Sequence, residues 1–180
     1  MGRHAAKLSA GPCFTGGADT MKPTSFVVNV SLDGLVPLSE FSTLLPLRGI
    51  YVMSNSEQII RVGESSSGMS RLKKGFRDPF RRTIGGKDKK NYIAYAWRTN
   101  YHGKPVKVDY FELQDLRFDD NHFRRSLEAE LTFQFRIAYK HWPREMSEIH
   151  FLERFRNDSL LTETATAILK HYGINYQGSV

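Results

Sequence analysis

The chain has 180 residues, with 26 Lys and Arg against 19 Asp and Glu, and its net charge is +7. This length fits one domain, and the basic surplus favours a polyanionic partner. The single cysteine, Cys13, excludes an intrachain disulfide and any zinc site built from several cysteines. No apolar run approaches the roughly 18 to 20 residues that span a bilayer. We therefore expect a cytoplasmic (intracellular, reducing) location and no membrane association.

Residues 1–24 are rich in Gly and Ala and lack periodicity, which is typical of a flexible tail. We expect residues 25–180 to form a single domain. Short apolar or alternating segments within it predict strands at residues 26–30, 49–53, 58–63, 92–98 and 106–113.

The turn-forming residues 54–57 are expected to join two of these strands into a hairpin. The length of the connection decides which side chains meet. With an odd number of residues, Tyr51 lies directly opposite Arg61 and the two side chains share one face. An even number separates them.

Helices are expected at residues 39–45, at 70–77, from Asp119 or Asp120 to about Lys140, and at 159–172. The longest of them carries an apolar stripe of Leu127, Leu131, Phe135 and Ala138, which predicts a buried face. Gly173 is expected to end the last helix. Together these elements predict an α/β (α+β) fold, with a small, mostly antiparallel central sheet flanked by helices.

A block of basic residues follows the predicted hairpin. Between residues 71 and 90 there are nine Lys and Arg against two Asp. The nine cations are Arg71, Lys73, Lys74, Arg77, Arg81, Arg82, Lys87, Lys89 and Lys90. Such a block is typical of a surface that follows a nucleic-acid backbone, so we expect the residues after Arg71 to bind nucleic acid.

Four sequence features, taken in order, resemble the GIY-YIG nuclease superfamily. Residues 45–53 contain the triplet Gly49-Ile50-Tyr51, and residues 60–63 provide a second motif ending in glycine. Arg71 stands eight residues after that glycine, where the family places its helix arginine. Residues 126–131 resemble the segment that carries the family's metal-binding glutamate.

The resemblance covers residues 44–142 as the core of a nuclease domain, and the remainder would form a C-terminal helical extension. It implies a metal-dependent endonuclease that hydrolyses phosphodiester bonds, with DNA favoured over RNA. Glu128 would hold Mg²⁺ or Mn²⁺ beside the apolar stripe of its helix. Arg71 would clamp the scissile phosphate, and Tyr51 would bind or deprotonate the attacking water. Cutting both strands would need a homodimer or two sequential nicks.

The chain departs from the family pattern at two positions near the motifs. Arg61 replaces the second motif tyrosine, and Gly75 stands where a histidine or tyrosine often follows the helix arginine. Because arginine stays protonated, we expect Arg61 to bind phosphate or stabilise the transition state. These departures favour an alternative function, a catalytically inactive nucleic-acid-binding module of the same fold. A basic protein–protein adaptor is a third hypothesis.

Each candidate site residue can also be interpreted as having no function beyond the fold. Tyr51 would serve only as a strand residue at the edge of the core, and Arg71 only as a solvated helix cation. Glu128 would be a surface acid paired with Arg124 or Arg125 at helical spacing. Glu130 is the second candidate for the metal ligand.

Overall fold

The computed structural model describes residues 21–29, 48–68, 83–84, 87–88, 100–101, 103–146, 149 and 151–178. The helices expected at 39–45 and 70–77 and the strand expected at 92–98 lie outside these residues, as does the expected tail as far as residue 20. Within the described part of that tail, Met21 packs against the core and Thr24 begins the first strand.

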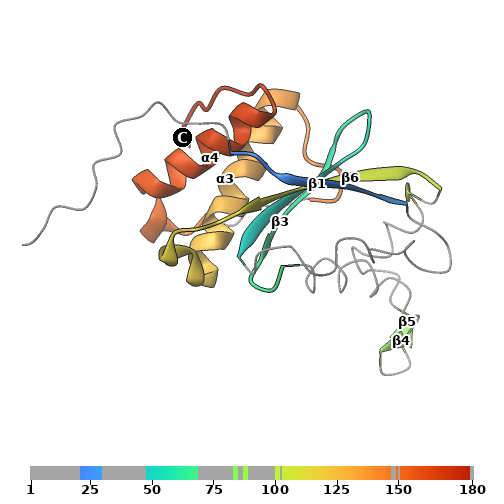
Figure 1. Ribbon diagram of the computed structural model, residues 1–180, viewed down its shortest axis with the longest axis horizontal. Helices are drawn as coiled ribbons and strands as arrows, with labels where there is room; N and C mark the ends of the chain where they lie inside the picture. Colours follow the sequence, from blue (N-terminus) through green and yellow to red (C-terminus); the bar gives the residue numbers. More distant parts are fainter. Residues whose placement is uncertain are drawn as a thin grey trace, which may run out of the picture.

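Four antiparallel strands form the central sheet in the order β1-β6-β2-β3 (Figure 1). These strands are β1 (Thr24–Asn29), β2 (Gly49–Ser54), β3 (Ile59–Ser65) and β6 (Pro105–Glu112). The helices are η3 (Leu116–Asp119), α3 (Asn121–Tyr139), η4 (Glu153–Phe155) and α4 (Ser159–His171). A separate ribbon pairs β4 (Thr83–Ile84) with β5 (Lys87–Asp88). The predicted α/β class with an antiparallel sheet is confirmed.

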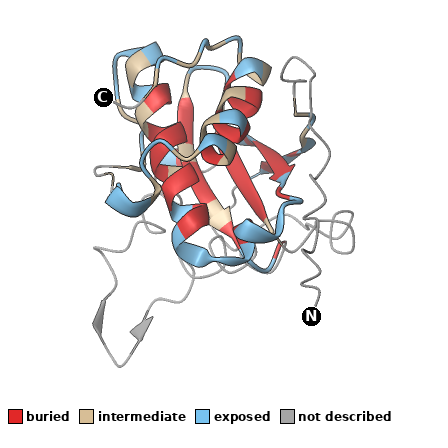
Figure 2. Cartoon of the chain, turned by 90° about the vertical axis from the view of Figure 1, so that its left-hand side faces the viewer, coloured by how far each residue is buried: buried red, intermediate tan, exposed pale blue. Residues whose placement is uncertain are grey.

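The two long helices pack together and cover one face of the sheet (Figures 1 and 2). Alternate strand residues point toward them, as the twofold repeat of a strand requires. Ile50, Val52 and Phe111 from the sheet are fully buried in one cluster with side chains of both helices. None of the described helices is long and apolar enough to cross a membrane.

The predicted stripe on α3 is confirmed except at its end. Leu127, Leu131 and Phe135 are fully buried, but Ala138 is exposed, so its predicted burial is wrong. Phe135 is the last α3 residue of the described core, and the final turn extends past it into solvent. Of the two aspartates considered for the helix start, Asp120 is the N-cap.

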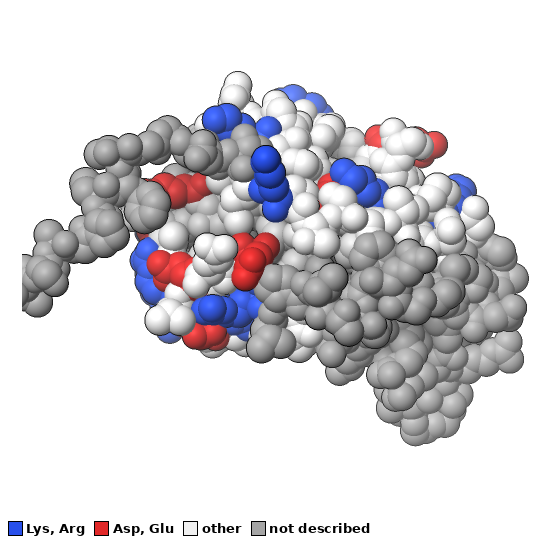
Figure 3. Space-filling view, in the orientation of Figure 1, with Lys and Arg blue, Asp and Glu red and all other residues white. Residues whose placement is uncertain are grey.

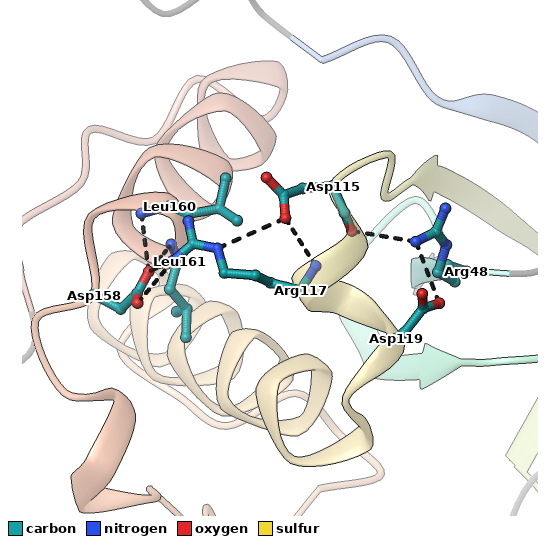
Figure 4. Close-up of polar contacts among 7 residues, drawn as sticks. All are labelled: Arg48, Asp115, Arg117, Asp119, Asp158, Leu160 and Leu161. Atoms are coloured by element: carbon teal, nitrogen blue, oxygen red, sulfur yellow. Dashed lines mark hydrogen bonds and ion pairs between the residues drawn. The ribbon is translucent and has the colours of Figure 1, made fainter. Parts of the chain in front are cut away.

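Charged contacts hold the start of β2 against the segment that leads into α3 (Figure 4). Arg48 pairs with Asp119 at 3.2 Å and donates to the carbonyl oxygen of Asp115 at 3.3 Å. Arg117 contacts Asp115 at 3.6 Å and Asp158 at 3.1 Å. Asp158 also caps α4 by accepting from amides of its first turn. The starts of β2, α3 and α4 are therefore linked by one set of polar contacts.

Asp109 on β6 is fully buried and ties the sheet to the end of α4. Its carboxylate accepts from the hydroxyl of Ser25 on β1 and from the hydroxyl of Tyr172 at 2.9 Å. Lys107 lies 3.0 Å from the same carboxylate. Burial, and then the negative charge of Asp109, raise the pKa of Tyr172 well above its usual range. This carboxylate therefore joins an outer strand, an inner strand and the C-terminus of the last helix.

We expect the variant Asp109→Asn to be less stable than the wild type. The hydroxyl groups of Ser25 and Tyr172, which donate to Asp109, would lose their anionic acceptor. The free energy of unfolding should fall by about 2 to 3 kcal/mol. Glu163→Gln makes the same chemical change at an exposed position of α4 and should alter stability by less than about 0.5 kcal/mol. Urea denaturation measures both values, and equal effects of the two substitutions would contradict the assignment.

Candidate functional site

The register of the β2–β3 hairpin follows neither of the two alternatives considered for its connection. Tyr51 lies opposite Gly63, and Met53 lies opposite Arg61. The direct pairing of Tyr51 with Arg61, which an odd connection would give, is therefore not formed. The two side chains are diagonal neighbours instead and still share one face of the sheet.

A β-bulge produces this arrangement. The ladder pairs Ser54 with Ile59 next to the turn, and the register then shifts between Met53 and Ser54. Without the shift, Arg61 would fall opposite Val52, on the face that packs against the helices. The extra residue on β3 moves Arg61 to the face that carries the tyrosine.

Two tyrosine rings lie over glycines of the adjacent strands. A Cβ atom added at Gly63 would lie 2.2 Å from the hydroxyl oxygen of Tyr51. A Cβ atom added at Gly49 would lie 2.4 Å from the hydroxyl oxygen of Tyr110. Any larger residue at either position would displace a ring, so packing requires the glycine of each sequence motif.

The two tyrosines differ in where their hydroxyl groups end. Tyr110 is 1% exposed, and its hydroxyl hydrogen-bonds with Ser65 on β3. Burial raises the pKa of Tyr110 to about 12. Among the described residues, every buried polar side-chain atom has a hydrogen-bond partner. The hydroxyl of Tyr51 has no described partner, so its oxygen is not fully buried. Tyr51 is 6% exposed, so its ring is buried and only its hydroxyl end reaches solvent beside β3, the outer of the described strands of the sheet.

Arg61 presents a cation on the same face. Its side chain is half-buried, and no carboxylate in the described part of the chain pairs with it. Diagonal neighbours on one face of a sheet lie about 7 to 8 Å apart, which a long arginine side chain can bridge. The guanidinium of Arg61 and the phenol of Tyr51 are thus both available to one anion at this edge.

The buried cation Arg124 fixes α3 against β3 from the opposite face of the sheet. Its Nε lies 2.9 Å from a carboxylate oxygen of Glu64. One terminal nitrogen donates to the carbonyl oxygens of Phe118 and Asp119. Arg124 therefore pairs with a residue of β3, and its charge is already engaged without Glu128.

Glu128 lies beside β3, between two contacts of α3 with that strand. Arg124 makes the first contact, one helical turn before Glu128. Thr132, one turn after Glu128, donates its hydroxyl hydrogen to the carbonyl oxygen of Glu128 at 2.7 Å, and its oxygen lies 3.6 Å from the sulfur of Met146. That sulfur accepts from the amide of Val62 at 3.4 Å. Residues four apart lie on one side of a helix, so Glu128 flanks the middle of β3. It is partly exposed, as expected beside an apolar stripe.

Three of the four predicted catalytic residues therefore flank one strand. Tyr51 and Arg61 approach β3 on one face of the sheet, and Glu128 approaches it from the helix that packs on the other face. Arg71 lies outside the described residues. The same is true of Lys73, Lys74, Arg77, Arg81, Arg82, Lys89 and Lys90, whereas Lys87 lies in β5.

The chemistry of Glu128 fits a magnesium or manganese ligand. Its carboxylate is a hard oxygen donor, and Mg²⁺ commonly binds one or two carboxylates and keeps several waters. The described residues contain no group of three or more His, Cys, Asp or Glu placed to hold a metal. The second candidate, Glu130, is buried, accepts a hydrogen bond from Gln134 at 2.9 Å and lines a cavity next to α4. Glu130 is therefore turned away from the Tyr51 edge of the sheet.

Tyr110 and Ser65 carry no motif that marks them in the sequence. The alternation Val106, Val108, Tyr110 placed the tyrosine on one face of its predicted strand. That pattern gave no sign that its ring covers Gly49. The match between ring and glycine depends on which strand pairs with which.

We expect the two tyrosines to respond differently to loss of their hydroxyl groups. Tyr110→Phe removes a buried hydrogen bond and should lower the free energy of unfolding by about 1 kcal/mol. Tyr51→Phe removes a hydroxyl that has no described partner and should change it by less than about 0.5 kcal/mol. Chemical denaturation of both variants tests this order, and a larger loss for Tyr51→Phe would refute the solvent-facing hydroxyl.

Comparison with known proteins adds no family assignment. No family model, curated protein or solved structure matches this chain.

Proposed function

We propose that this protein is a metal-dependent endonuclease that hydrolyses phosphodiester bonds of DNA. The observation that carries the proposal is the solvent-reaching hydroxyl of Tyr51 beside the cation of Arg61, which has no described counter-ion. Glu128 flanks the same outer strand. The net charge of +7 supports a polyanionic substrate.

The residues divide the work of hydrolysis by their chemistry. The planar guanidinium of Arg61 suits a phosphate oxygen and stays protonated throughout. The hydroxyl of Tyr51 would orient the attacking water or take its proton. A divalent cation held by Glu128 would stabilise charge on the phosphate and on the leaving oxygen. Arg71 would supply the second phosphate contact that the resemblance implies.

The substrate would approach along β3. Backbone amides of Arg144 and Glu145 donate to the carbonyl oxygens of Ile59 and Ile60 along the outer side of β3. The substrate would therefore lie over the face that carries Tyr51 and Arg61, without pairing with the edge of the strand. On the face shown in Figure 3, basic and acidic side chains of the described residues are interspersed and form no continuous basic stripe. We therefore assign backbone tracking to the basic block at residues 73–90, in keeping with its sequence. A homodimer would allow both strands to be cut.

A nucleic-acid-binding module without catalytic turnover is the second candidate. Arg61 favours it, because an arginine in place of the second motif tyrosine cannot act as a general base. The same free cation beside Tyr51 would then bind phosphate without cleaving it. The two candidates predict the same affinity for DNA and differ only in cleavage.

We expect Glu128→Ala to abolish cleavage of supercoiled plasmid in Mg²⁺ or Mn²⁺, with a loss of at least about 100-fold. DNA binding, measured by fluorescence anisotropy, should stay within about twofold because the phosphate contacts remain. Glu163→Gln, the exposed acid on α4, serves as the matched control and should cleave like the wild type. A wild-type protein that binds but never nicks the plasmid would favour the module.

Binding should weaken steeply as salt rises, because each phosphate contact releases condensed counterions. With about four to six contacts, the affinity for duplex DNA should fall by roughly 100-fold or more between 50 and 200 mM salt. Arg61→Gln should reduce the slope of log affinity against log salt by about one contact. An affinity that does not change with salt would rule out both nucleic-acid functions and favour the adaptor.

A further inference from the structure

A second site lies on the other side of α3, independent of the proposed nuclease function. Residues of α3, η4, α4 and the C-terminal segment enclose a cavity of about 160 Å³. Four aromatic residues, Phe133, Phe151, Phe155 and Tyr176, line it together with two leucines and several polar and charged residues. The rings of Phe133 and Phe151 meet edge to face with centroids 5.7 Å apart. A concave site that combines aromatic side chains with polar groups is typical of small-molecule sites.

The carboxylate of Glu130 is a buried charged group of this cavity. The residue is 4% exposed, and its Oε1 accepts a hydrogen bond from the side chain of Gln134 at 2.9 Å. Within the described parts of the chain, no Lys, Arg or His pairs with Glu130, and every buried polar atom has a partner. The second carboxylate oxygen must therefore touch open space, and the cavity is the space that Glu130 lines.

The other charges around the cavity are already balanced. Arg156 lies 3.8 Å from Glu153 at the rim, and both side chains are well exposed. Asp158 pairs with Arg117 at 3.1 Å and caps α4. Glu130 is thus the lining carboxylate without a described counter-charge. A buried carboxylate without a counter-charge raises the free energy of the folded protein, and a bound cation offsets this cost.

We propose that this cavity binds a small organic cation that carries an aromatic or similarly flat apolar group. Its ammonium or amidinium would donate to the free oxygen of Glu130. Its apolar body would pack among Phe133, Phe151 and Phe155, whose ring faces also attract positive charge. The ligand therefore needs both features, since the apolar walls accept any apolar group, whereas Glu130, the lining carboxylate without a described counter-charge, selects for positive charge.

Benzylamine, benzyl alcohol and benzoate test the proposal on the full-length protein, because they share a ring and differ in charge. Titrations followed by backbone amide NMR should show saturable binding of benzylamine, with shifts near Phe151 and Leu161 at the cavity. Benzyl alcohol should bind at least about tenfold more weakly, and benzoate should not bind. Equal affinity for the amine and the alcohol, or no saturable binding of benzylamine, would overturn the proposal.

Two variants separate charge from packing. Glu130→Gln should reduce the affinity for benzylamine to that for benzyl alcohol. Glu163→Gln, at an exposed position of α4 that does not line the cavity, should leave the affinity for benzylamine unchanged. Phe151→Ala, at a side chain that is 50% exposed, should weaken the binding of benzylamine and of benzyl alcohol by the same factor. Thermal unfolding checks that each variant folds. If Glu130→Gln does not fold, the proposal is tested by comparing the affinities for benzylamine and benzyl alcohol in the wild type and in Phe151→Ala. Wild-type affinity in folded Glu130→Gln would refute the role of the carboxylate.

Discussion

Two glycines make room for two tyrosine rings, and the candidate site depends on this packing. Gly49 lies under Tyr110, and Gly63 lies under Tyr51, so neither glycine has space for a Cβ atom. The glycines thus allow each ring to lie across the neighbouring strand. Without them, the phenol groups would be pushed away from the sheet.

The same local packing leads to different chemistry because the tyrosines occupy different strands. Tyr110 belongs to β6, and its ring crosses β2, so its hydroxyl ends on Ser65 of β3 and is buried. Tyr51 belongs to β2, and its ring crosses β3, which is the last strand on that side of the sheet among the described residues. The first hydroxyl stabilises the sheet, whereas the second reaches solvent. Strand order alone makes one tyrosine structural and the other a candidate for chemistry.

Helix α3 separates two acidic positions that are only two residues apart in the chain. The pair between Arg124 and Glu64, together with the contact of Thr132 with Met146, holds one side of the helix against β3. Glu128 lies on that side, beside the strand that Tyr51 reaches. Glu130 lies on another side and lines the aromatic cavity next to α4. One helix therefore supplies a carboxylate to each of two proposed sites, because two residues span about half a helical turn.

The sequence alone determined the local elements, because these follow from short-range periodicity and capping. It predicted β2, β3 and β6 to within two residues at each end, as well as the buried stripe of α3 as far as Phe135 and the end of α4 at Gly173. Only the tertiary structure decided the relations between elements. The face occupied by Arg61 depends on a bulge, whose presence is set by strand pairing and cannot be counted from the loop length. The cavity at Glu130 is formed by segments that lie tens of residues apart, so no local pattern encodes it.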